Sequence, residues 1–466
     1  MRKKYFFIML FGALQSVYSQ KTDYCVQDIS ITNSTISMIT TNGEVYSWGN
    51  NNYGQVGIGN TQSQNTPLLR PTPDFISVYH SLSHSIGLTN GGKLYGWGRN
   101  MRGQVGDGTI TEQYSPMLIG TDSDWKKVVA GLAHTVALKN NGTLWGWGNN
   151  AACELSSTSP NPYPNEYFTQ PAQLSNDTNW VDIAAGGFRT FAIKSNGTLW
   201  ARGKNHSNSL GLPYGENTCV TNFSQLGTDT NWKKVITSSD GDFTLALKTN
   251  NTLWGWGDNI MGGVGNGASV LVATPVQIGT DTWKEVATGQ TYSVGIKSDG
   301  TLWQWGKGCI NPSSNVIYPV NSLSPVMVGN DTDWVKVYAG HCVSIAQKAD
   351  GSVWSWGGYT NIWSSSGAIS SMQPILLFQC ARASTSEADY QSSDIILYPN
   401  PAIDTLSWAQ NIVIEKVTIY DMSGRIVSSQ NVQGSSVNIS SLTAGTYMIK
   451  LESKEKRIYH SKFVKK

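Results

Sequence analysis

Short runs of alternating apolar and polar residues follow one another along most of the chain, and tight turns separate them. One stretch predicts strands at Lys127–Gly131, Thr135–Lys139 and Leu144–Trp147. Asn141-Gly142, between the second and third runs, is a strong hairpin signal. A proline-led segment such as Pro116–Ile119 predicts a shorter fourth strand. The basic unit of the chain is therefore expected to be a sheet of four antiparallel strands.

This unit recurs with a period of roughly fifty residues, and an aromatic-x-Trp-Gly motif marks the third strand of each copy. The copies, named repeats one to seven below, carry this motif at 46–50, 95–99, 145–149, 200–204, 254–258, 303–307 and 354–358. Repeat four is degenerate, because Arg202 replaces the second tryptophan. Trp145 and Trp147 share a strand face, which predicts packing against the neighbouring unit. Four-stranded repeats of this length predict an all-β fold, a seven-bladed β-propeller.

Composition agrees with short strands joined by turns. The chain of 466 residues contains 48 glycines and 18 tryptophans, and only 14% of its residues are charged. A helical protein would be richer in Ala, Glu, Lys and Leu. The net charge of +2 offers no clustered cationic surface for phosphates, so no nucleic acid partner is expected.

The N-terminal residues are typical of an export signal. Arg2, Lys3 and Lys4 precede an apolar run at Tyr5–Leu14, which is too short to span a bilayer, and no later membrane span is predicted. Near the other end, small polar residues indicate a linker. The predicted organisation is a signal peptide at 1–20, the repeats at 21–380, a linker at 381–393 and a C-terminal secretion domain at 394–466.

The repeats resemble those of the regulator-of-chromosome-condensation family. Its pattern of G-x-x-H-[ST]-x-A-L followed by N-G-x-L-W-x-W-G-x-N is visible at 131–150 and at 81–109, and the resemblance covers about residues 25–380. It implies a seven-bladed propeller that binds proteins through loops on one face. The founding nuclear member is a nucleotide-exchange factor for a small GTPase, and a bacterial relative inhibits a β-lactamase. Neither activity carries over residue by residue, and the export signal excludes the nuclear one.

The tail shows a second pattern. Alternating apolar residues at Val417 and Ile419 and in AGTYMIKL at 444–451 predict strands of a small β-sandwich. This segment, YPNP at 398–401 and YDMSGR at 420–425 resemble the type A C-terminal sorting domain of the type IX secretion system of Bacteroidetes. The resemblance implies that the secretion machinery is a partner. It also implies a secreted protein that is either released or anchored at the outer cell surface.

The cysteines of an exported chain are candidates for disulfides. Alignment of the repeats places Cys25 and Cys380 at adjoining positions at the two ends of the ring, where a bond would close it. The other cysteines fall in corresponding places of neighbouring repeats. We predict the pairs Cys25–Cys380, Cys153–Cys219 and Cys309–Cys342.

Candidate reactive groups have plainer explanations. His84 and His134 occupy the same register in successive repeats, which favours a packing role over general-base catalysis. A zinc site at Cys309, His341 and Cys342 is disfavoured, since adjacent ligands rarely fit tetrahedral geometry and no fourth ligand is evident. Acidic turns such as 122–125 suit Asx-turns better than calcium loops. No catalytic set, metal or cofactor is predicted.

The best candidate site is a surface. Loops after the third strand are long at about 149–171, 204–225, 307–325 and 358–373. They carry aromatic residues at Tyr163, Tyr167, Phe168, Tyr214, Phe223, Tyr318, Tyr359 and Trp363. Long loops on one face of a repeat protein often form its binding face, and aromatic residues are enriched at interfaces. The alternative is that these loops only cap the fold.

The sequence therefore predicts a secreted or cell-surface binding protein that is not an enzyme and that recognises another protein through one propeller face. A surface polysaccharide is the second candidate ligand, because exposed aromatic rings also stack on sugars. The alternative class is an enzyme, a polysaccharide hydrolase or lyase on the same scaffold. A third possibility is a structural component of the cell surface.

Overall fold

The computed structural model describes residues 25–32, 35–70, 73–156, 166–237, 240–310, 317–358, 371–378, 397–408, 413–421, 425–432, 434–454 and 458–466. The chain divides into two compact units, Met1–Ala381 and Arg382–Lys466, and the division falls at the start of the predicted linker. Helix is confined, within these ranges, to the single turn η1 (His206–Asn208). None of the described segments forms a helix long and apolar enough to cross a membrane.

The first unit is built from short antiparallel strands in chain order. Repeats one and two contain β1 (Val26–Ile31), β2 (Thr35–Thr40), β3 (Val45–Gly49), β4 (Gln64–Arg70), β5 (Phe75–His80), β6 (His84–Thr89), β7 (Leu94–Gly98) and β8 (Gln113–Leu118). Repeats three and four contain β9 (Trp125–Ala130), β10 (His134–Lys139), β11 (Leu144–Asn149), β12 (Tyr167–Gln173), β13 (Trp180–Gly186), β14 (Arg189–Lys194), β15 (Leu199–Lys204) and β16 (Cys219–Gln225). Repeats five to seven contain β17 (Trp232–Ile236), β18 (Phe243–Lys248), β19 (Thr252–Gly257), β20 (Val272–Thr288), β21 (Tyr292–Lys297), β22 (Leu302–Ile310), β23 (Ile317–Met327), β24 (Trp334–Ala339), β25 (Val343–Lys348), β26 (Val353–Gly357) and β27 (Ser371–Phe378).

Each repeat pairs its strands in sequence order, which confirms the predicted four-strand unit. Repeats five and six share β20, whose first part pairs with β19 and whose second part pairs with β21, so that they form one seven-stranded sheet. In repeat three, β9 begins earlier than predicted, because Trp125 still pairs with Lys139. Similarly, β11 extends to Asn149, which pairs with Tyr167 of β12.

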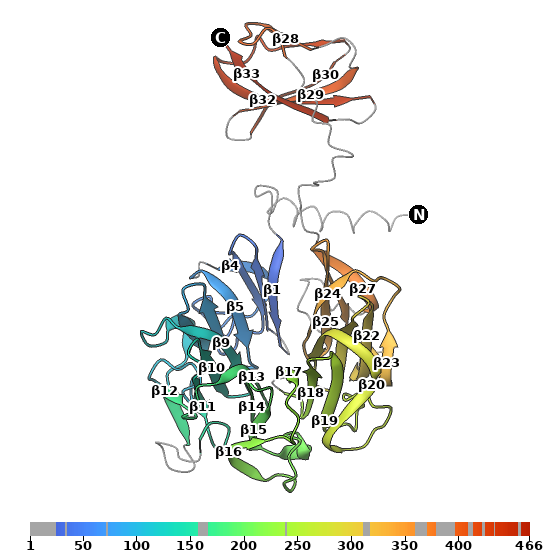
Figure 1. The fold of residues 1–466 in the computed structure, drawn as a ribbon. Helices are drawn as coiled ribbons and strands as arrows, with labels where there is room; N and C mark the ends of the chain where they lie inside the picture. Colours follow the sequence, from blue (N-terminus) through green and yellow to red (C-terminus); the bar gives the residue numbers. More distant parts are fainter. Residues whose placement is uncertain are drawn as a thin grey trace. The chain divides into compact units, whose positions relative to one another are not determined.

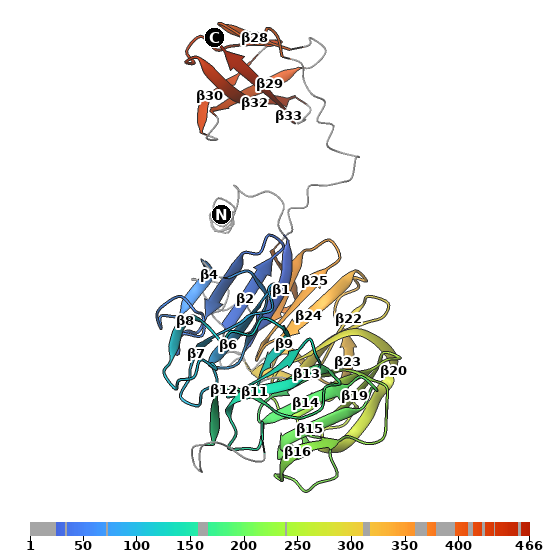
Figure 2. The same ribbon diagram turned by 60° about the vertical axis from the view of Figure 1, so that its left-hand side comes forward.

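The sheets follow one another in chain order (Figures 1 and 2). The first strands of the repeats line a common cavity. The cavity has a volume of about 450 Å³ and is lined by β1, β5, β9, β13, β17, β20 and β24, the first strand of every repeat. Along β9 the exposure alternates, so that Lys127 and Val129 are partly accessible while Trp125 and Val128 are buried. The first strand of each repeat is therefore the inner strand, and the fourth is the outer strand.

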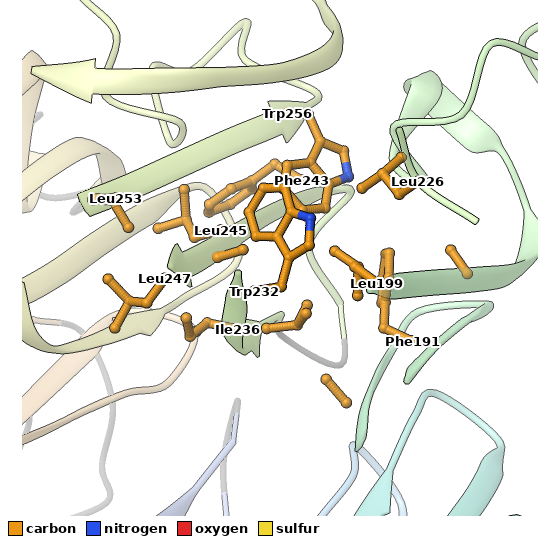
Figure 3. Packing of buried hydrophobic residues seen from close by; sticks show 14 of the residues in the cluster. Phe191, Leu199, Leu226, Trp232, Ile236, Phe243, Leu245, Leu247, Leu253 and Trp256 are labelled. Atoms are coloured by element: carbon orange, nitrogen blue, oxygen red, sulfur yellow. The ribbon is translucent and has the colours of Figure 1, made fainter. Parts of the chain in front are cut away.

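The motif tryptophans form the core between sheets. Trp256 lies with Trp232 and Phe243 in a cluster that also contains Leu199 and Phe191 of the preceding repeat (Figure 3). The second motif tryptophans of the other repeats are equally buried, at Trp48, Trp97, Trp147, Trp305 and Trp356. The predicted packing role of these residues is thus confirmed.

Hydrogen bonds between repeats accompany this packing. The indole N–H of Trp147 donates to Gln104 O at 3.0 Å, and the hydroxyl of Thr135 donates to the same carbonyl at 3.0 Å. Gln104 belongs to the preceding repeat, so each set of bonds joins two neighbouring repeats. The same arrangement occurs with Trp97 and Ser85 on Gln55 O, with Trp256 and Thr244 on Ser209 O, and with Trp305 and Ser293 on Gly263 O.

The first and last repeats also touch. Gln347 Nε2 donates to Val26 O at 2.8 Å, and Lys336 Nζ donates to Gln27 O at 2.6 Å. Apolar residues of repeats one and seven share a single core cluster that includes Val26 and Ile345. The two ends of the repeat array therefore meet directly.

The acidic turns before the inner strands are occupied by lysine. Lys248 Nζ lies 2.8 Å from Asp229 Oδ2 and above the rings of Trp232 and Trp254, at 4.8 and 3.7 Å from their centroids. Lys139, Lys194, Lys297 and Lys348 make the same ammonium–aromatic–carboxylate contact in their own repeats. These ion pairs explain the recurring aspartates, for which the sequence offered only Asx-turns or calcium.

The disulfides follow the predicted register. Cys153–Cys219 joins repeats three and four with a Cα–Cα distance of 5.9 Å, and Cys309–Cys342 joins repeats six and seven at 5.4 Å. Both predicted pairs are confirmed. Cys25 is also disulfide-bonded, and its predicted partner Cys380 lies outside the described residues.

The second unit contains β28 (Thr405–Ser407), β29 (Ile414–Asp421), β30 (Ile426–Asn431), β31 (Ser436–Asn438), β32 (Gly445–Ser453) and β33 (Ile458–Lys465). One sheet has the order β30-β29-β32-β33, and β28 pairs with β31 in a second. Trp408, Leu406 and Ile449 lie in a common core. The alternating positions Val417 and Ile419 are fully buried, as predicted for strands.

Candidate recognition site

Each sheet of the first unit has two ends with different connections. The connections after the first and third strands emerge at one end, named the loop face here, and the hairpins after the second strands emerge at the other, the hairpin face. The fully described third-strand loops are 50–63, 99–112, 205–218 and 258–271. Among the described connections, those of the loop face are therefore the longest. The predicted long loops at 204–225 and 307–325 are shorter in the structure, because β16 begins at Cys219, β22 continues to Ile310 and β23 begins at Ile317.

These loops are held from inside by a buried asparagine. Asn259 Oδ1 accepts from Val264 N at 3.0 Å, and Asn259 Nδ2 donates to Ala268 O at 2.8 Å. Gly267 N then donates to Leu323 O of the next repeat at 2.9 Å. The asparagines at the same place in other loops are Asn51, Asn100, Asn150 and Asn205. Such tethering presents the loop in a fixed conformation before any ligand arrives.

Large apolar side chains are exposed on these loops. Ile260 and Val270 are 63% and 62% exposed, Met101 and Ile110 are 57% and 51% exposed, and Tyr214 is 45% exposed. Sequence reasoning looked for aromatic residues and missed the four aliphatic ones. The signal was present, since apolar pairs such as Ile260-Met261 interrupt an otherwise Gly-rich loop.

The predicted aromatic residues have different locations. Tyr163, Tyr359 and Trp363 lie outside the described residues, and the backbone of Tyr318 lies in β23 opposite Cys309. Tyr167 lies in β12 and is partly buried. Tyr214 is exposed on its loop. Among the predicted aromatic residues, Tyr214 is the one for which the structure shows an exposed side chain.

Phe168 and Phe223 require a correction. Both belong to outer strands, not to projecting loops, and both pack on hydrophobic clusters between sheets. The Phe223 ring lies 5.2 Å from the ring of Trp180, and the Arg202 guanidinium lies 5.1 Å from Phe223. Their rings therefore stabilise the fold, and they are not free binding groups.

Repeat four compensates for its missing tryptophan. Arg202 Nε lies 3.4 Å from Cys153 O of repeat three, and its terminal nitrogen donates to Thr221 O. Glu154 stands where repeats one and two have Gln55 and Gln104, and its burial raises its pKa to about 7. The Glu154 charge favours the cationic form of Arg202, although burial lowers the pKa of Arg202 to about 10. The Cys153–Cys219 disulfide holds the same junction.

Histidines near the cavity divide into two groups. Burial lowers the pKa of His80, His84 and His134 to about 3, so all three are neutral at physiological pH. His84 Nε2 lies 3.1 Å from Thr135 Oγ1 of the next repeat, in keeping with the predicted packing role. At the loop face, His341 Nδ1 lies 3.2 Å from Asp240 Oδ2, and the other accessible pair joins His206 to Asp242 at 3.0 Å.

Cys309, His341 and Cys342 are close enough to hold a metal ion, with their ligand atoms within 4.8 Å of one another. The two sulfur atoms are joined in a disulfide. An oxidised pair offers no thiolate, and thiolate is the ligand that a Cys-rich zinc site needs. The geometry is therefore that of a disulfide with a neighbouring histidine.

The cavity wall carries charges of alternating sign. Lys127 Nζ contacts Asp182 Oδ1 at 2.5 Å between repeats three and four, and Lys234 pairs with Glu285 between repeats five and six. Lys336 attracts Asp28 across the junction of repeats seven and one. These oppositely charged groups face each other between neighbouring repeats, which stabilises the junctions.

Residues 12–312 match the family model of the RCC1-like domain, and residues 396–466 match that of the secretion system C-terminal sorting domain. No curated protein sequence gives a match.

Solved structures share the fold of the first unit. Human WBSCR16 is 18% identical with a TM-score of 0.62, and the match covers 72% of this chain and 95% of that one. Prp20p from Saccharomyces cerevisiae is 20% identical with a TM-score of 0.60, covering 68% of this chain and 81% of that one. At such identities the likeness shows a propeller-like, all-β fold alone.

The sorting-domain match indicates a protein that is secreted or held at the outer surface. The family-model match extends over more than half of the chain and includes the aromatic-x-Trp-Gly motifs of repeats one to six. The chain belongs to the family of the RCC1-like domain and carries a type IX secretion sorting domain at residues 396–466.

Proposed function

We propose that the first unit is a non-catalytic recognition module that binds a protein partner at the loop face. The observation that carries this proposal is the set of exposed apolar side chains on loops that are already fixed in place. Ile260, Val270 and Met101 are each more than half exposed, although the backbone around them is tied by buried asparagines. Exposed apolar groups on a rigid support cost little entropy to bury, which favours an interface.

The chemistry of these groups favours protein over polysaccharide. Sugars are bound by flat aromatic rings and by hydrogen-bonding side chains, whereas an aliphatic surface suits the apolar surface of another protein. Loop 258–271 carries Ile260, Met261, Val270 and Leu271 and only one charged residue, Asp258. A glycan would leave these four side chains without a complementary contact.

The environments of the histidine side chains also support a binding role. His80, His84 and His134 are buried and neutral, so they have no access to a substrate. The accessible histidines His206 and His341 each contact a carboxylate at the loop face. Such pairs can hold neighbouring loops together without any reaction.

We also propose that the first unit is a closed seven-bladed propeller and that the second is a small β-sandwich. The seven inner strands around one cavity and the direct contact of repeats one and seven support a closed, seven-bladed propeller. The two sheets of the second unit and their common core support a small sandwich. Four-stranded blades arranged in this way leave their loops gathered at two faces.

The test is capture of secreted or surface proteins by the purified full chain. A triple variant, Met101→Ser with Ile260→Ser and Val270→Ser, should reduce capture at least about tenfold, because loss of two or three apolar anchors costs more than 1.4 kcal/mol. The control is Ile76→Ser with Val181→Ser, which removes apolar groups that are 39% and 41% exposed at the hairpin face. Equal loss in both variants, or turnover of a polysaccharide by the pure protein, would contradict the proposal.

A further inference from the structure

The outer strands of the repeats share a proline at one register. In repeat two, Tyr95 pairs with Leu118 and Gly96 with Met117, and Pro116 precedes this pair. The same place, read from the pairing of each third strand, holds Pro67, Pro171, Pro275, Pro325 and Pro374. Proline has no backbone N–H, and on an edge strand it interrupts the row of donors that another chain would pair with.

Repeat four is the exception among the outer strands that the structure describes. Trp200 pairs with Gln225 and Ala201 with Ser224, so the corresponding residue of β16 is Phe223. Leu226 N donates inward to Leu199 O at 2.8 Å, as Ile119 N does to Leu94 O in repeat two. Successive residues of a strand direct their backbone groups to opposite sides. The N–H group of Gln225 therefore faces away from β15. Phe223 adjoins the register shift between Ala201 and Gly203, and its N–H occupies the place at which the other repeats carry proline and so need no donor toward the third strand.

This edge is also held rigidly. Cys219 at the start of β16 is bonded to Cys153, and Arg202 donates to Thr221 O. The Phe223 ring packs against Trp180, which fixes the backbone of the residue that replaces proline. Most β16 residues remain partly or fully exposed. A strand with these properties needs no rearrangement before another strand is added.

We propose that β16 is a docking edge for an extended segment of a partner protein, which adds to the sheet as a further strand. The inference rests on the proposed function and specifies how the partner is held. Outward N–H and C=O groups along a strand edge are complementary to the backbone of an extended polypeptide. Tyr214, whose hydroxyl lies 3.5 Å from Ser224 Oγ, stands beside the edge and is available to a side chain of the added strand.

The β16 edge is distinct from the loops that carry the exposed apolar side chains. Substitutions at the edge and in the loops can therefore test the two binding modes separately. Phe223 and Gln225 belong to the outer strand of repeat four, whereas Ile260 and Val270 belong to a loop of repeat five. A partner that uses the loops alone would leave the backbone groups of β16 in contact with water.

The test is selection of linear peptides of about ten residues, displayed as a random library, on the purified full chain. Selected peptides are then measured on Phe223→Pro and Phe223→Ala. Both variants lose the ring, but only proline removes the N–H, so their difference isolates the backbone donor. Affinity for Phe223→Pro should be at least about tenfold below that for Phe223→Ala, the effect of one or two lost hydrogen bonds. Hydrogen exchange on the wild-type chain should slow at residues 221–225 when the peptide binds.

Equal affinity for both variants, or no enriched peptide, would overturn the inference. Unchanged exchange at 221–225 in the wild-type complex would overturn it even if Phe223→Pro fails to fold. Concentration-dependent dimerisation of the free chain that Phe223→Pro abolishes would assign the edge to a second copy instead. If the loop variants lose capture while Phe223→Pro keeps it, the proposed function stands and only the docking edge is rejected.

Discussion

Among single residues, buried polar side chains join neighbouring repeats and make the stability of the protein sensitive to acidic pH. His80 bridges Ser37 and Ser85 with its two ring nitrogens, at 2.7 and 2.6 Å. His84 and His134 contact a threonine of the next repeat. A neutral imidazole satisfies these contacts, whereas an imidazolium in the same place would be a buried and unpaired charge.

Acid should therefore unfold the first unit early. The folded-state pKa values of about 3 for His80, His84 and His134 lie below the usual 6.5, so the unfolded state alone gains protons as the pH falls below about 6.5. Stability is complete above that pH and should fall by about 2 kcal/mol per histidine by pH 5. Thermal unfolding at pH 7.5 and pH 5 measures the loss. The double variant His84→Gln with His134→Gln should show a shallower pH dependence, and an unchanged one would refute this account.

The lysine above the tryptophan pair should contribute measurably to stability. Lys248 is nearly buried, with 7% of its side chain exposed, whereas Asp229 is half exposed. Lys248→Met keeps the aliphatic stem but removes the charge, and we expect a loss of about 1–3 kcal/mol. Asp229→Asn should cost less than about 1 kcal/mol, because exposed ion pairs are weak. Chemical denaturation compares the two, and a larger effect of Asp229→Asn would show that the ion pair outweighs the aromatic contact.

At the scale of strands, the edge prolines prevent unwanted pairing. β8 exposes Met117 and Leu118 beside Pro116, a combination that would favour aggregation without the proline. Pro116→Val restores an outward N–H next to these apolar side chains. We expect concentration-dependent association by light scattering, with little change in the stability of the monomer. A second change, Met117→Lys, should reverse the association, and a fully monomeric Pro116→Val would contradict the role of the proline.

The disulfide between repeats three and four should stabilise the degenerate junction. Cys153 and Cys219 close a loop with a sequence separation of 66 residues. Cys153→Ser with Cys219→Ser should lower the unfolding free energy by about 2–4 kcal/mol. Hydrogen exchange in β16 should rise more than in β8, which has no disulfide. Uniform destabilisation of both strands would show that the disulfide does not act locally.

At the scale of the whole molecule, much of the fold could be predicted because its information is local and repeated. Asn141-Gly142 defines a hairpin, and Trp147 marks a core position whatever lies elsewhere in the chain. The register of the repeats was sufficient to pair Cys153 with Cys219 and Cys309 with Cys342, because the cysteines of each pair fall on neighbouring repeats.

The contacts between repeats were not predictable in the same way. Lys248 lies in β18 and Asp229 lies in the turn before β17, and their meeting depends on the register of the ladder. Phe223 looked like a free aromatic residue, because nothing in its neighbourhood reveals that Trp180 and Arg202 pack against it. The exposed Ile260 and Val270 look like core residues in the sequence, since exposure is decided by the tethered loop around them.

Recognition of a protein at the loop face can be measured as a hydrogen-exchange footprint of the full chain with a captured partner. The account predicts slower exchange in the loops 99–112, 205–218 and 258–271, with unchanged exchange in the hairpins after β6, β10 and β18. Protection confined to those hairpins, or no protection in the first unit at all, would contradict it.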